Sequence, residues 1–330
     1  MRVAFVGKGG SGKTTVSALF ARYVASRGLP VVAIDADINQ HLGMVLGMED
    51  QALPRPMGSH LTEIKEWLRG DNPRISSAAA MVKTTPPGRG SRLLELPSAA
   101  SAGGVLTDPI HEGFAAAAPY GPWLMATGPF GESDLGVACY HSKVGAVELY
   151  LNHLVDGPGQ YVVVDMTAGA DSFASGLFTR FDLTFLVAEP TRQGVGVYRQ
   201  YREYAADYGV AVAVVGNKVQ SPQDVAFLRE HVGSDLLVCL GHSGVVRGME
   251  QGRPFGLEDL EPEVSSGLGA LLEAVDGREK DWERFGRQTV EFHLRNARAW
   301  ANRATGEDLA AQIDPDFVFG PQITAAGSPA

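Results

Sequence analysis

A glycine-rich segment near the start of the chain restricts its possible folds more than any other feature. Residues 6–15 read VGKGGSGKTT. An apolar run at 3–6 precedes this segment, and apolar residues at helical spacing follow it, at positions 16, 19, 20, 23 and 24. A buried strand, a glycine-rich turn and a helix N-terminus in this order form a phosphate-binding loop. The sequence therefore predicts a site for a phosphate-containing ligand.

The residue types of this loop each suit phosphate binding. Glycines let the backbone curl so that its N–H groups point at the phosphates, and the dipole of the following helix adds positive potential. A lysine at position 13 can reach the β and γ phosphates, and the hydroxyl at position 14 can ligate Mg²⁺. A glycine-rich turn that binds nothing is the alternative, and the correct flanks argue against it. The predicted ligand contacts are Gly7, Gly9, Gly10, Ser11, Gly12, Lys13, Thr14 and Thr15.

The composition narrows the classes of partner. The chain of 330 residues is 45% hydrophobic, enough for a large core, and its formal net charge is −10. That charge argues against a general nucleic-acid or anionic-membrane surface, although a local basic patch stays open. No apolar run reaches the length of a membrane span, and residues 1–15 do not resemble a signal peptide. Two cysteines, Cys139 and Cys239, give no disulfide framework, so we expect a cytoplasmic protein.

Apolar runs typical of strands alternate with helical patterns along the chain. This alternation predicts an α/β fold with a doubly wound, mainly parallel sheet. Cys239 falls within one of these runs and is expected in the core. Among residues 50–135, which are harder to interpret, a helix is expected over 59–69. The predicted strands are 3–6, 30–35, 161–165, 181–189, 210–218 and 236–240, with short candidates at 93–96 and 123–126.

Acidic side chains end two of the predicted strands. Asp35 ends the strand after the first helix and is followed by Asp37, and Asp165 ends the strand at 161–165. The carboxyl ends of parallel strands meet at one edge of a sheet, beside the phosphate loop. Carboxylates there can hold Mg²⁺ or orient an attacking water. We predict that Thr14, Asp35 and Asp165 bind Mg²⁺; strand-end acids that only cap a turn are the alternative.

A second lysine in the loop points to a family. The pattern K-G-G-x-G-K-T-T, which starts at Lys8, resembles the "deviant" phosphate loop of dimeric P-loop NTPases. These include nitrogenase iron protein, arsenite-pump and tail-anchor-targeting ATPases, and septum-positioning and plasmid-partition ATPases. The resemblance implies ATP and Mg²⁺ as ligands, an ATP-dependent homodimer, and a Lys8 that reaches the partner's nucleotide. An ordinary solvated lysine is the alternative.

The same resemblance assigns roles along the chain. The D-x-D-x-N segment at 35–39 resembles the family's first switch, in which Asp37 positions the hydrolytic water, so the expected catalytic residues are Lys8, Lys13 and Asp37. D-x-x-A-G at 165–169 resembles the second switch, with Gly169 as the γ-phosphate sensor. Asn217 resembles the adenine-recognising asparagine, and a turn cap is its alternative.

Cys139 and His141 precede a helical pattern and are both of types that ligate transition metals. From the residues alone, a small buried thiol and a structural histidine are the better interpretation. However, residues 1–275 resemble the nickel-insertion accessory ATPases of carbon monoxide dehydrogenase, which carry Cys-x-Cys here and bind a metal across the dimer. This chain has His141 at the second cysteine's place, and the residues directly after Gly169, 170–172, are ADS, without the histidine that these ATPases often carry there. The resemblance implies Zn²⁺ or Ni²⁺ at a dimer interface.

These features predict an ATP-dependent dimeric switch. Its domains would be a P-loop ATPase at 1–275, with a variable region at 50–135, and a helical extension with a disordered tail at 276–330. ATP hydrolysis would be coupled to metal-centre maturation or to loading of a client, such as a metalloenzyme. The alternative is a partition or positioning ATPase that acts on DNA, a membrane or a protein cargo. The sequence does not identify the client.

Overall fold

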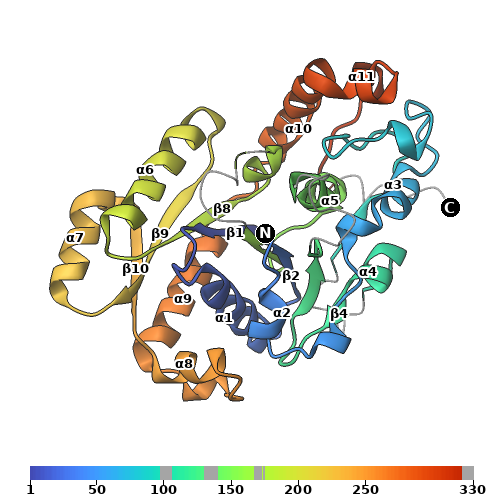
Figure 1. Cartoon of the computed structure of the whole chain (residues 1–330). Helices are drawn as coiled ribbons and strands as arrows, with labels where there is room; N and C mark the ends of the chain where they lie inside the picture. The colour runs from blue at the N-terminus through green and yellow to red at the C-terminus, as the bar shows by residue number, and fades with distance from the viewer. Residues whose placement is uncertain (97–105, 130–139, 167–172, 174, 322–330) are drawn as a thin grey trace.

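The computed structural model describes residues 1–96, 106–129, 140–166, 173 and 175–321. Within these residues, eight strands form one sheet in the order β10-β9-β8-β1-β7-β2-β5-β4 (Figure 1). Neighbouring strands are parallel except β4, which runs antiparallel to β5. The predicted mainly parallel α/β sheet is confirmed. The strands are β1 Arg2–Gly7, β2 Val31–Ala36, β4 Ala116–Ala117, β5 Trp123–Ala126, β7 Tyr161–Met166, β8 Leu183–Ala188, β9 Val212–Val219 and β10 Leu236–Gly241, and a separate parallel pair joins β3 Leu94–Glu95 to β6 Leu154–Val155.

Helices cover both faces of the sheet, as a doubly wound fold requires. One hydrophobic cluster joins α1 and α9 to one face, and a second joins α5, α6 and α7 to the other. None of the helices in the described parts of the chain is long and apolar enough to cross a membrane. The helices are α1 Lys13–Ser26, α2 Leu42–Val45, α3 Leu61–Arg69, α4 Pro109–Phe114, α5 Tyr140–His153, α6 Arg192–Ala205, α7 Pro222–Val232, α8 Gly244–Glu250, α9 Pro262–Asp276, α10 Trp282–Asn296 and α11 Asn302–Thr305.

The central strands form because their sequences are apolar on both sides. Every residue of β1, β2, β7 and β8 is buried, which suits parallel strands covered on two faces. Strand β10 lies at an edge of the sheet, and only Leu240 of its residues is buried. Cys239 is therefore only partly buried, so it packs against the predicted core from its edge and does not lie within it.

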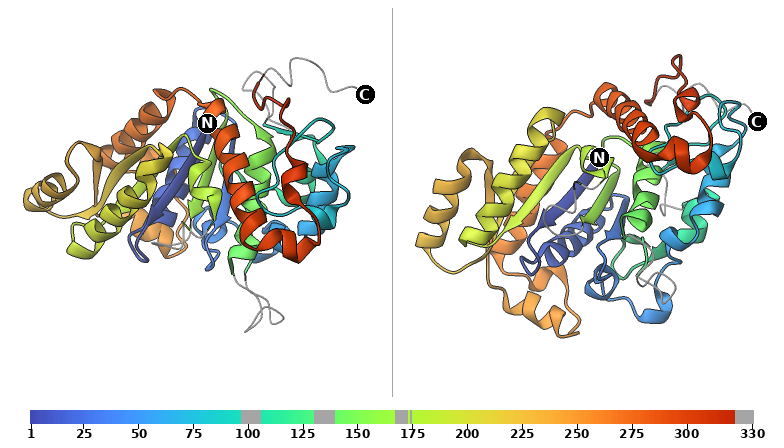
Figure 2. Two further views of the ribbon diagram at one scale, coloured as in Figure 1. Left: turned by 90° about the horizontal axis from the view of Figure 1, so that it is seen from above. Right: turned by 45° about the horizontal axis from the view of Figure 1, so that its top comes forward.

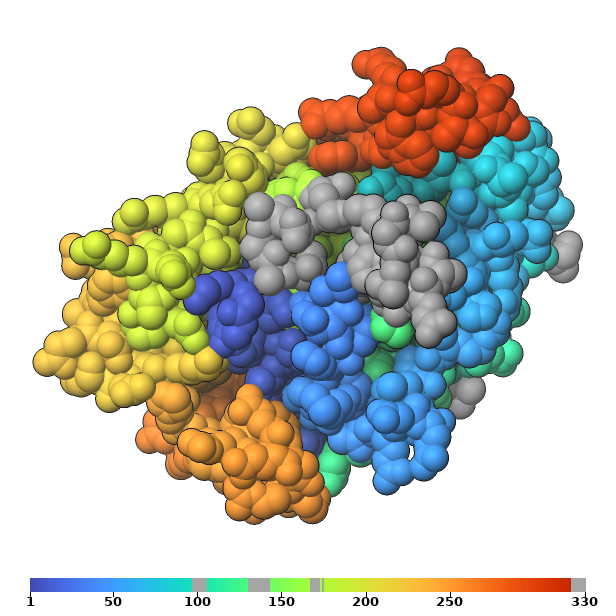
Figure 3. Space-filling model, in the orientation of Figure 1, coloured from blue at the N-terminus to red at the C-terminus, as the bar shows by residue number. Residues whose placement is uncertain are grey.

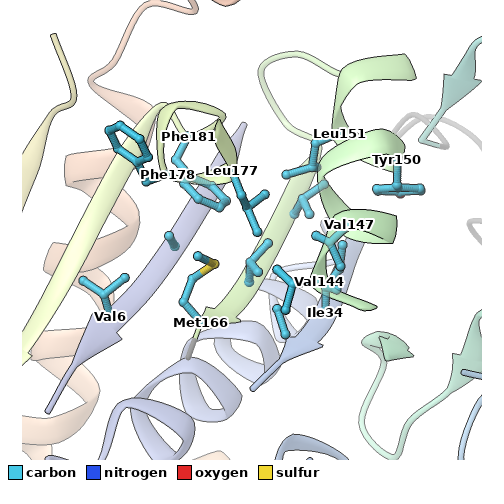
Figure 4. Packing of buried hydrophobic residues seen from close by; sticks show 14 of the residues in the cluster. Val6, Ile34, Val144, Val147, Tyr150, Leu151, Met166, Leu177, Phe178 and Phe181 are labelled. Carbon is cyan, nitrogen blue, oxygen red and sulfur yellow. The ribbon is translucent and has the colours of Figure 1, made fainter. Parts of the chain in front are cut away.

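Helix α5 supplies much of the core on its face of the sheet. Val144 and Val147 of α5 belong to the same cluster as Ile34 of β2 and Met166 of β7 (Figure 4). Leu177 joins them from a short 3₁₀ turn at Gly176–Thr179. This packing fixes the start of α5 beside the carboxyl ends of β2 and β7.

The C-terminal extension lies on the same side of the sheet as α5, where α10 packs against the 3₁₀ turn at Gly176–Thr179. After α10, a π-helical turn at Ala297–Ala301 leads into α11, so the predicted C-terminal extension is helical with an irregularity between these two helices (Figure 2). The guanidinium of Arg180, which is fully buried, donates to the Phe285 carbonyl at 3.0 Å and to the Thr289 hydroxyl at 2.6 Å. Buried polar contacts of this kind fix one packing geometry.

An ionic cluster ties this extension to the sheet. The buried carboxylate of Asp156 forms ion pairs with Arg2 Nε at 2.7 Å and with Lys280 Nζ at 2.8 Å. Lys280, which lies just before α10, also pairs with Asp182 at 2.7 Å. Burial raises the pKa of Asp156, but the cations around it outweigh burial and hold that pKa well below its usual range.

Candidate functional site

The glycine-rich loop between β1 and α1 has a shape that only glycine permits at two positions. Gly12 precedes α1 with φ 91°, in the left-handed region, and a Cβ there would lie 2.3 Å from the side-chain nitrogen of Asn217. A Cβ on Gly7 would lie 2.5 Å from the carbonyl oxygen of Val187 in β8. The loop is thus a narrow cradle at the carboxyl end of the central strand.

Two neighbouring residues of β9 hold this loop by its carbonyl groups. The Asn217 amide donates to the Ser11 carbonyl at 2.7 Å. Lys218, at φ 58°, donates to the Gly10 carbonyl at 2.6 Å and pairs with Glu189 at 2.8 Å. The Ser11 N–H donates to the Lys8 carbonyl at 3.1 Å. A loop held in this shape can present its remaining N–H groups to a ligand.

The three predicted carboxylates meet beside the first turn of α1. Asp35 and Asp165 are paired in register on β2 and β7. The Thr14 hydroxyl donates to Asp165 Oδ2 at 2.6 Å. Lys13 Nζ forms an ion pair with Asp37 Oδ2 and lies 4.0 Å from Asp165 Oδ1. The lysine, the threonine and the three acids, which come from three separate segments of the sequence, therefore form one cluster.

Burial perturbs the ionisation of this cluster. Burial and then the charge of Asp165 raise the pKa of Asp35 to about 8. Burial also raises the pKa of Asp165 to about 7, although Lys13 and Thr14 favour its charged form. Burial lowers the pKa of Lys13, but the charges of Asp165 and Asp37 outweigh it and raise that pKa overall. Burial thus opposes the charged forms of Asp35 and Asp165, and a cation bound between them would favour those charged forms.

The oxygen atoms in the cluster suit Mg²⁺. Asp165 Oδ1 is buried and, within the described part of the chain, has no hydrogen-bond partner. With the Thr14 hydroxyl it offers hard oxygen ligands of the kind Mg²⁺ takes. Asp35 is more engaged: its Oδ1 accepts from the Asp37 N–H at 3.1 Å and its Oδ2 from the Leu42 N–H at 2.8 Å. Asp35 thus shapes the turn after β2, and its predicted magnesium contact stays a prediction.

Some predicted residues lie elsewhere or outside the described residues. Lys8 is partly buried in the loop, next to the exposed Gly9 and Gly10. Cys139 and Gly169 lie outside the described residues, and His141 is placed only as a backbone position in the first turn of α5. The structure therefore brings together the phosphate-loop residues, Asn217 and the three acids.

The structure also shows a link that the sequence did not reveal. Gln40, at φ 52°, donates to the Thr127 hydroxyl at 3.0 Å and accepts from the Gly128 N–H at 3.0 Å. It joins the turn after Asp37 to the end of β5. A polar residue three positions after an aspartate gives no signal for such a contact; its positive φ is visible only in the structure.

A cleft of about 380 Å³ opens next to the loop. Its lining includes Gly12, Thr15 and Val16 from the loop and α1, Asn217 from β9, and Glu250 from α8. At its rim, the Thr15 hydroxyl donates to Glu250 Oε1 at 3.0 Å. Figure 3 shows the start of the chain, in dark blue, at the surface beside the orange segment that contains α8. Volumes of this order suit small ligands.

Comparisons with known proteins agree on one family. The model of the CobQ/CobB/MinD/ParA nucleotide binding domain matches residues 3–314. The carbon monoxide dehydrogenase accessory protein CooC of Rhodospirillum rubrum is 27% identical over 277 residues, which cover 83% of this chain and 96% of that protein. An uncharacterized ATP-binding protein of Methanocaldococcus jannaschii is 24% identical over 272 residues, 78% of this chain and 92% of that protein.

Solved structures show the same fold. The cell division ATPase MinD of Pyrococcus furiosus has a TM-score of 0.53 at 14% identity and covers 83% of this chain and 98% of its own. An ATP complex of a variant of McdA from Cyanothece has a TM-score of 0.52 at 16% identity, with 85% and 98% covered. At these identities the likeness concerns the fold alone.

Proposed function

Because the chain belongs to the CobQ/CobB/MinD/ParA nucleotide-binding family and is an ATPase of the MinD, ParA and CooC type, we propose that it is a homodimeric switch. ATP binding closes the dimer and hydrolysis opens it, and this cycle serves a client in the maturation of a metal centre. The observation that carries the proposal is the ion pair between Lys13 and Asp37 beside Thr14 and Asp165. It joins a phosphate-binding cation to the acid that positions water.

The ion pair gives the order of events. A γ-phosphate that reaches Lys13 competes with Asp37 for the ammonium, so phosphate binding releases the Asp37 carboxylate. The released carboxylate then orients the attacking water, as such acids do in phosphoryl transfer. Mg²⁺, held through Thr14 and Asp165, supplies positive charge to the phosphates. Asp37 is thus kept away from water until the substrate is in place.

Replacement of the two partners tests this chemistry. Lys13→Met is expected to lose ATP binding, because the buried ammonium contacts the phosphates. Asp37→Ala is expected to bind ATP and hydrolyse it about a hundredfold more slowly. Calorimetry and phosphate release measure the two effects, with Asp207→Ala on the exposed surface as the control. Unchanged turnover in Asp37→Ala would remove Asp37 from the catalytic role.

The dimer is tested at Lys8. This side chain is partly exposed at the loop that we propose faces the partner. Lys8→Ala is expected to keep more of the ATP affinity than Lys13→Met and to lose ATP-dependent dimerisation. Sedimentation in the Asp37→Ala background, where hydrolysis is slow, measures this. A monomer in every nucleotide state would contradict the dimeric switch.

The base site is proposed at Asn217. Its Nδ2 donates to the Ser11 carbonyl, and its Oδ1 can accept a hydrogen bond from the amino group of adenine. Guanine presents a carbonyl at that position, so we expect ATP to bind more tightly than GTP. Equal affinities in a competition titration would leave Asn217 as a structural tether of the loop.

Metal-centre maturation is proposed because of the likeness to an accessory protein of carbon monoxide dehydrogenase. Cys139 and His141 are the proposed metal ligands, two copies of the pair binding one ion between the subunits. Gln40 supports a connection between these two residues and the nucleotide site, because it links the turn after Asp37 to Gly128, which precedes Cys139 by eleven residues.

Elemental analysis of the ATP-loaded Asp37→Ala protein tests the metal proposal. One Zn²⁺ or Ni²⁺ for each dimer, lost in Cys139→Ser, is the expected result. A metal-free dimer, or full metal content in Cys139→Ser, would contradict it. ATP-dependent binding of that protein to DNA or to lipid vesicles would then favour a partition or positioning ATPase.

A further inference from the structure

The lining of the cleft beside the loop has two chemically different parts, a buried apolar one and an exposed polar one that also includes His242 and Arg247. Apolar side chains of α1, β10 and α9 form the buried part: Val16, Leu19, Leu240 and Val264. Thr15 and Glu250 lie at its rim, where the hydroxyl donates to the carboxylate at 3.0 Å. Apolar walls suit the flat face of a base, and the rim borders the phosphate loop, since Thr15 follows Thr14 directly. The sugar of a bound nucleotide would lie between the apolar walls and the phosphate loop.

Helix α8 holds Glu250 at this rim. The Ser243 hydroxyl accepts from the Val246 N–H at 2.9 Å and starts the helix, and the same hydroxyl donates to Glu261 at 2.5 Å. Glu261 lies immediately before α9, which packs against α1. The end of α8 is therefore fixed relative to Thr15, although the Glu250 side chain itself is exposed.

A carboxylate at this position selects one part of the nucleotide. It repels phosphate oxygens, so it does not serve as a phosphate contact. Its two oxygens accept hydrogen bonds, and a ribose offers two neighbouring hydroxyl donors. Acidic side chains recognise ribose hydroxyls in this way at other nucleotide sites. The amino group of adenine, the other donor of the nucleotide, is assigned above to Asn217, so the sugar hydroxyls are the donors that remain for this carboxylate.

We propose that Glu250 binds the ribose hydroxyls of the nucleotide and makes the site selective for ribonucleotides over deoxyribonucleotides. On binding, the carboxylate exchanges the Thr15 hydroxyl for the sugar hydroxyls, which leaves Thr15 to donate to a phosphate. This inference rests on the proposed ATPase function. Glu250 is a specificity residue and takes no part in the hydrolytic step.

Calorimetric titration of the full chain with ADP, 2′-deoxy-ADP and 3′-deoxy-ADP tests the inference without hydrolysis. We expect the wild type to bind ADP about tenfold more tightly than either deoxy analogue, a difference of about 1.4 kcal/mol. Glu250→Ala is expected to bind all three with similar affinity. Glu230→Ala removes an exposed glutamate of α7 away from the cleft and should keep the preference.

The ratio of affinities is the decisive quantity. A general weakening after the loss of the contact to Thr15 would affect all three ligands equally and leave the ratio unchanged. A wild type without preference, or a Glu250→Ala protein that keeps it, would overturn the inference. A wild type that binds none of the three nucleotides would instead contradict the proposed ATPase function.

Discussion

The ion pair between Lys13 and Asp37 should make Lys13, which we propose binds phosphate, a structural residue when no nucleotide is bound. The side chains of Lys13 and Asp37 are only 10% and 6% exposed. Lys13→Met keeps the length of the side chain but leaves Asp37 and its acidic neighbours without the cation. Removing one partner of a buried pair costs about 3–5 kcal/mol of unfolding free energy. We expect about 3 kcal/mol, because the carboxylates of the cluster can take up protons.

A double variant separates the two roles of the lysine. Lys13→Met/Asp37→Asn removes both charges, and such replacements are often neutral for stability. We expect the double variant to regain most of the lost stability and to remain unable to bind ATP. Urea denaturation without nucleotide measures the first quantity and calorimetry the second. Wild-type stability in Lys13→Met would refute the structural role, and recovered ATP binding in the double variant would refute the phosphate contact.

Three other predictions concern the scaffold of the site. Gly7→Ala puts a methyl group against the Val187 carbonyl and should destabilise the protein by about 1–3 kcal/mol, whereas Gly196→Ala, with open space around it, should not; thermal unfolding compares them. Asp156→Asn should lower the free energy of unfolding by about 3–5 kcal/mol, because it leaves buried cations unpaired. Urea denaturation measures this, and a loss no larger than that of the exposed substitution Asp207→Asn would contradict it. Burial lowers the pKa of His153 to about 4, so between this pH and about 6.5 the unfolded chain binds a proton that the folded chain does not. The free energy of unfolding should therefore fall by about 3 kcal/mol as the pH drops from about 6.5 to 4. The same pH dependence in His153→Gln would show that other groups cause it.

Much of the site could be predicted because its residues end strands. Apolar runs that end in Asp35 and Asp165 indicate parallel strands, and the carboxyl ends of such strands share an edge with the phosphate loop. The pairing of Thr14 with Asp165 follows from this arrangement. Periodicity likewise predicted α3 to within two residues of its start at Leu61.

The contacts that the sequence did not reveal depend on tertiary placement. Glu250 reaches Thr15 because α8 is seated by Glu261, and no local pattern carries that information. β4 consists of two alanines, too few for an alternation of apolar and polar residues. Cys239 has apolar neighbours in the sequence, but its exposure depends on the position of β10 at the edge of the sheet.

The tethering of the phosphate loop by Asn217 and Lys218 affects the thermodynamics of ligand binding. The side chains of these two residues hold the carbonyls of Ser11 and Gly10 before any ligand arrives. The backbone freedom of the glycines is therefore lost when the protein folds, and nucleotide binding does not bear that entropy cost. Glycines supply the loop's shape and two residues from β9 supply its rigidity, so a substitution far along the chain can weaken phosphate binding without touching a phosphate.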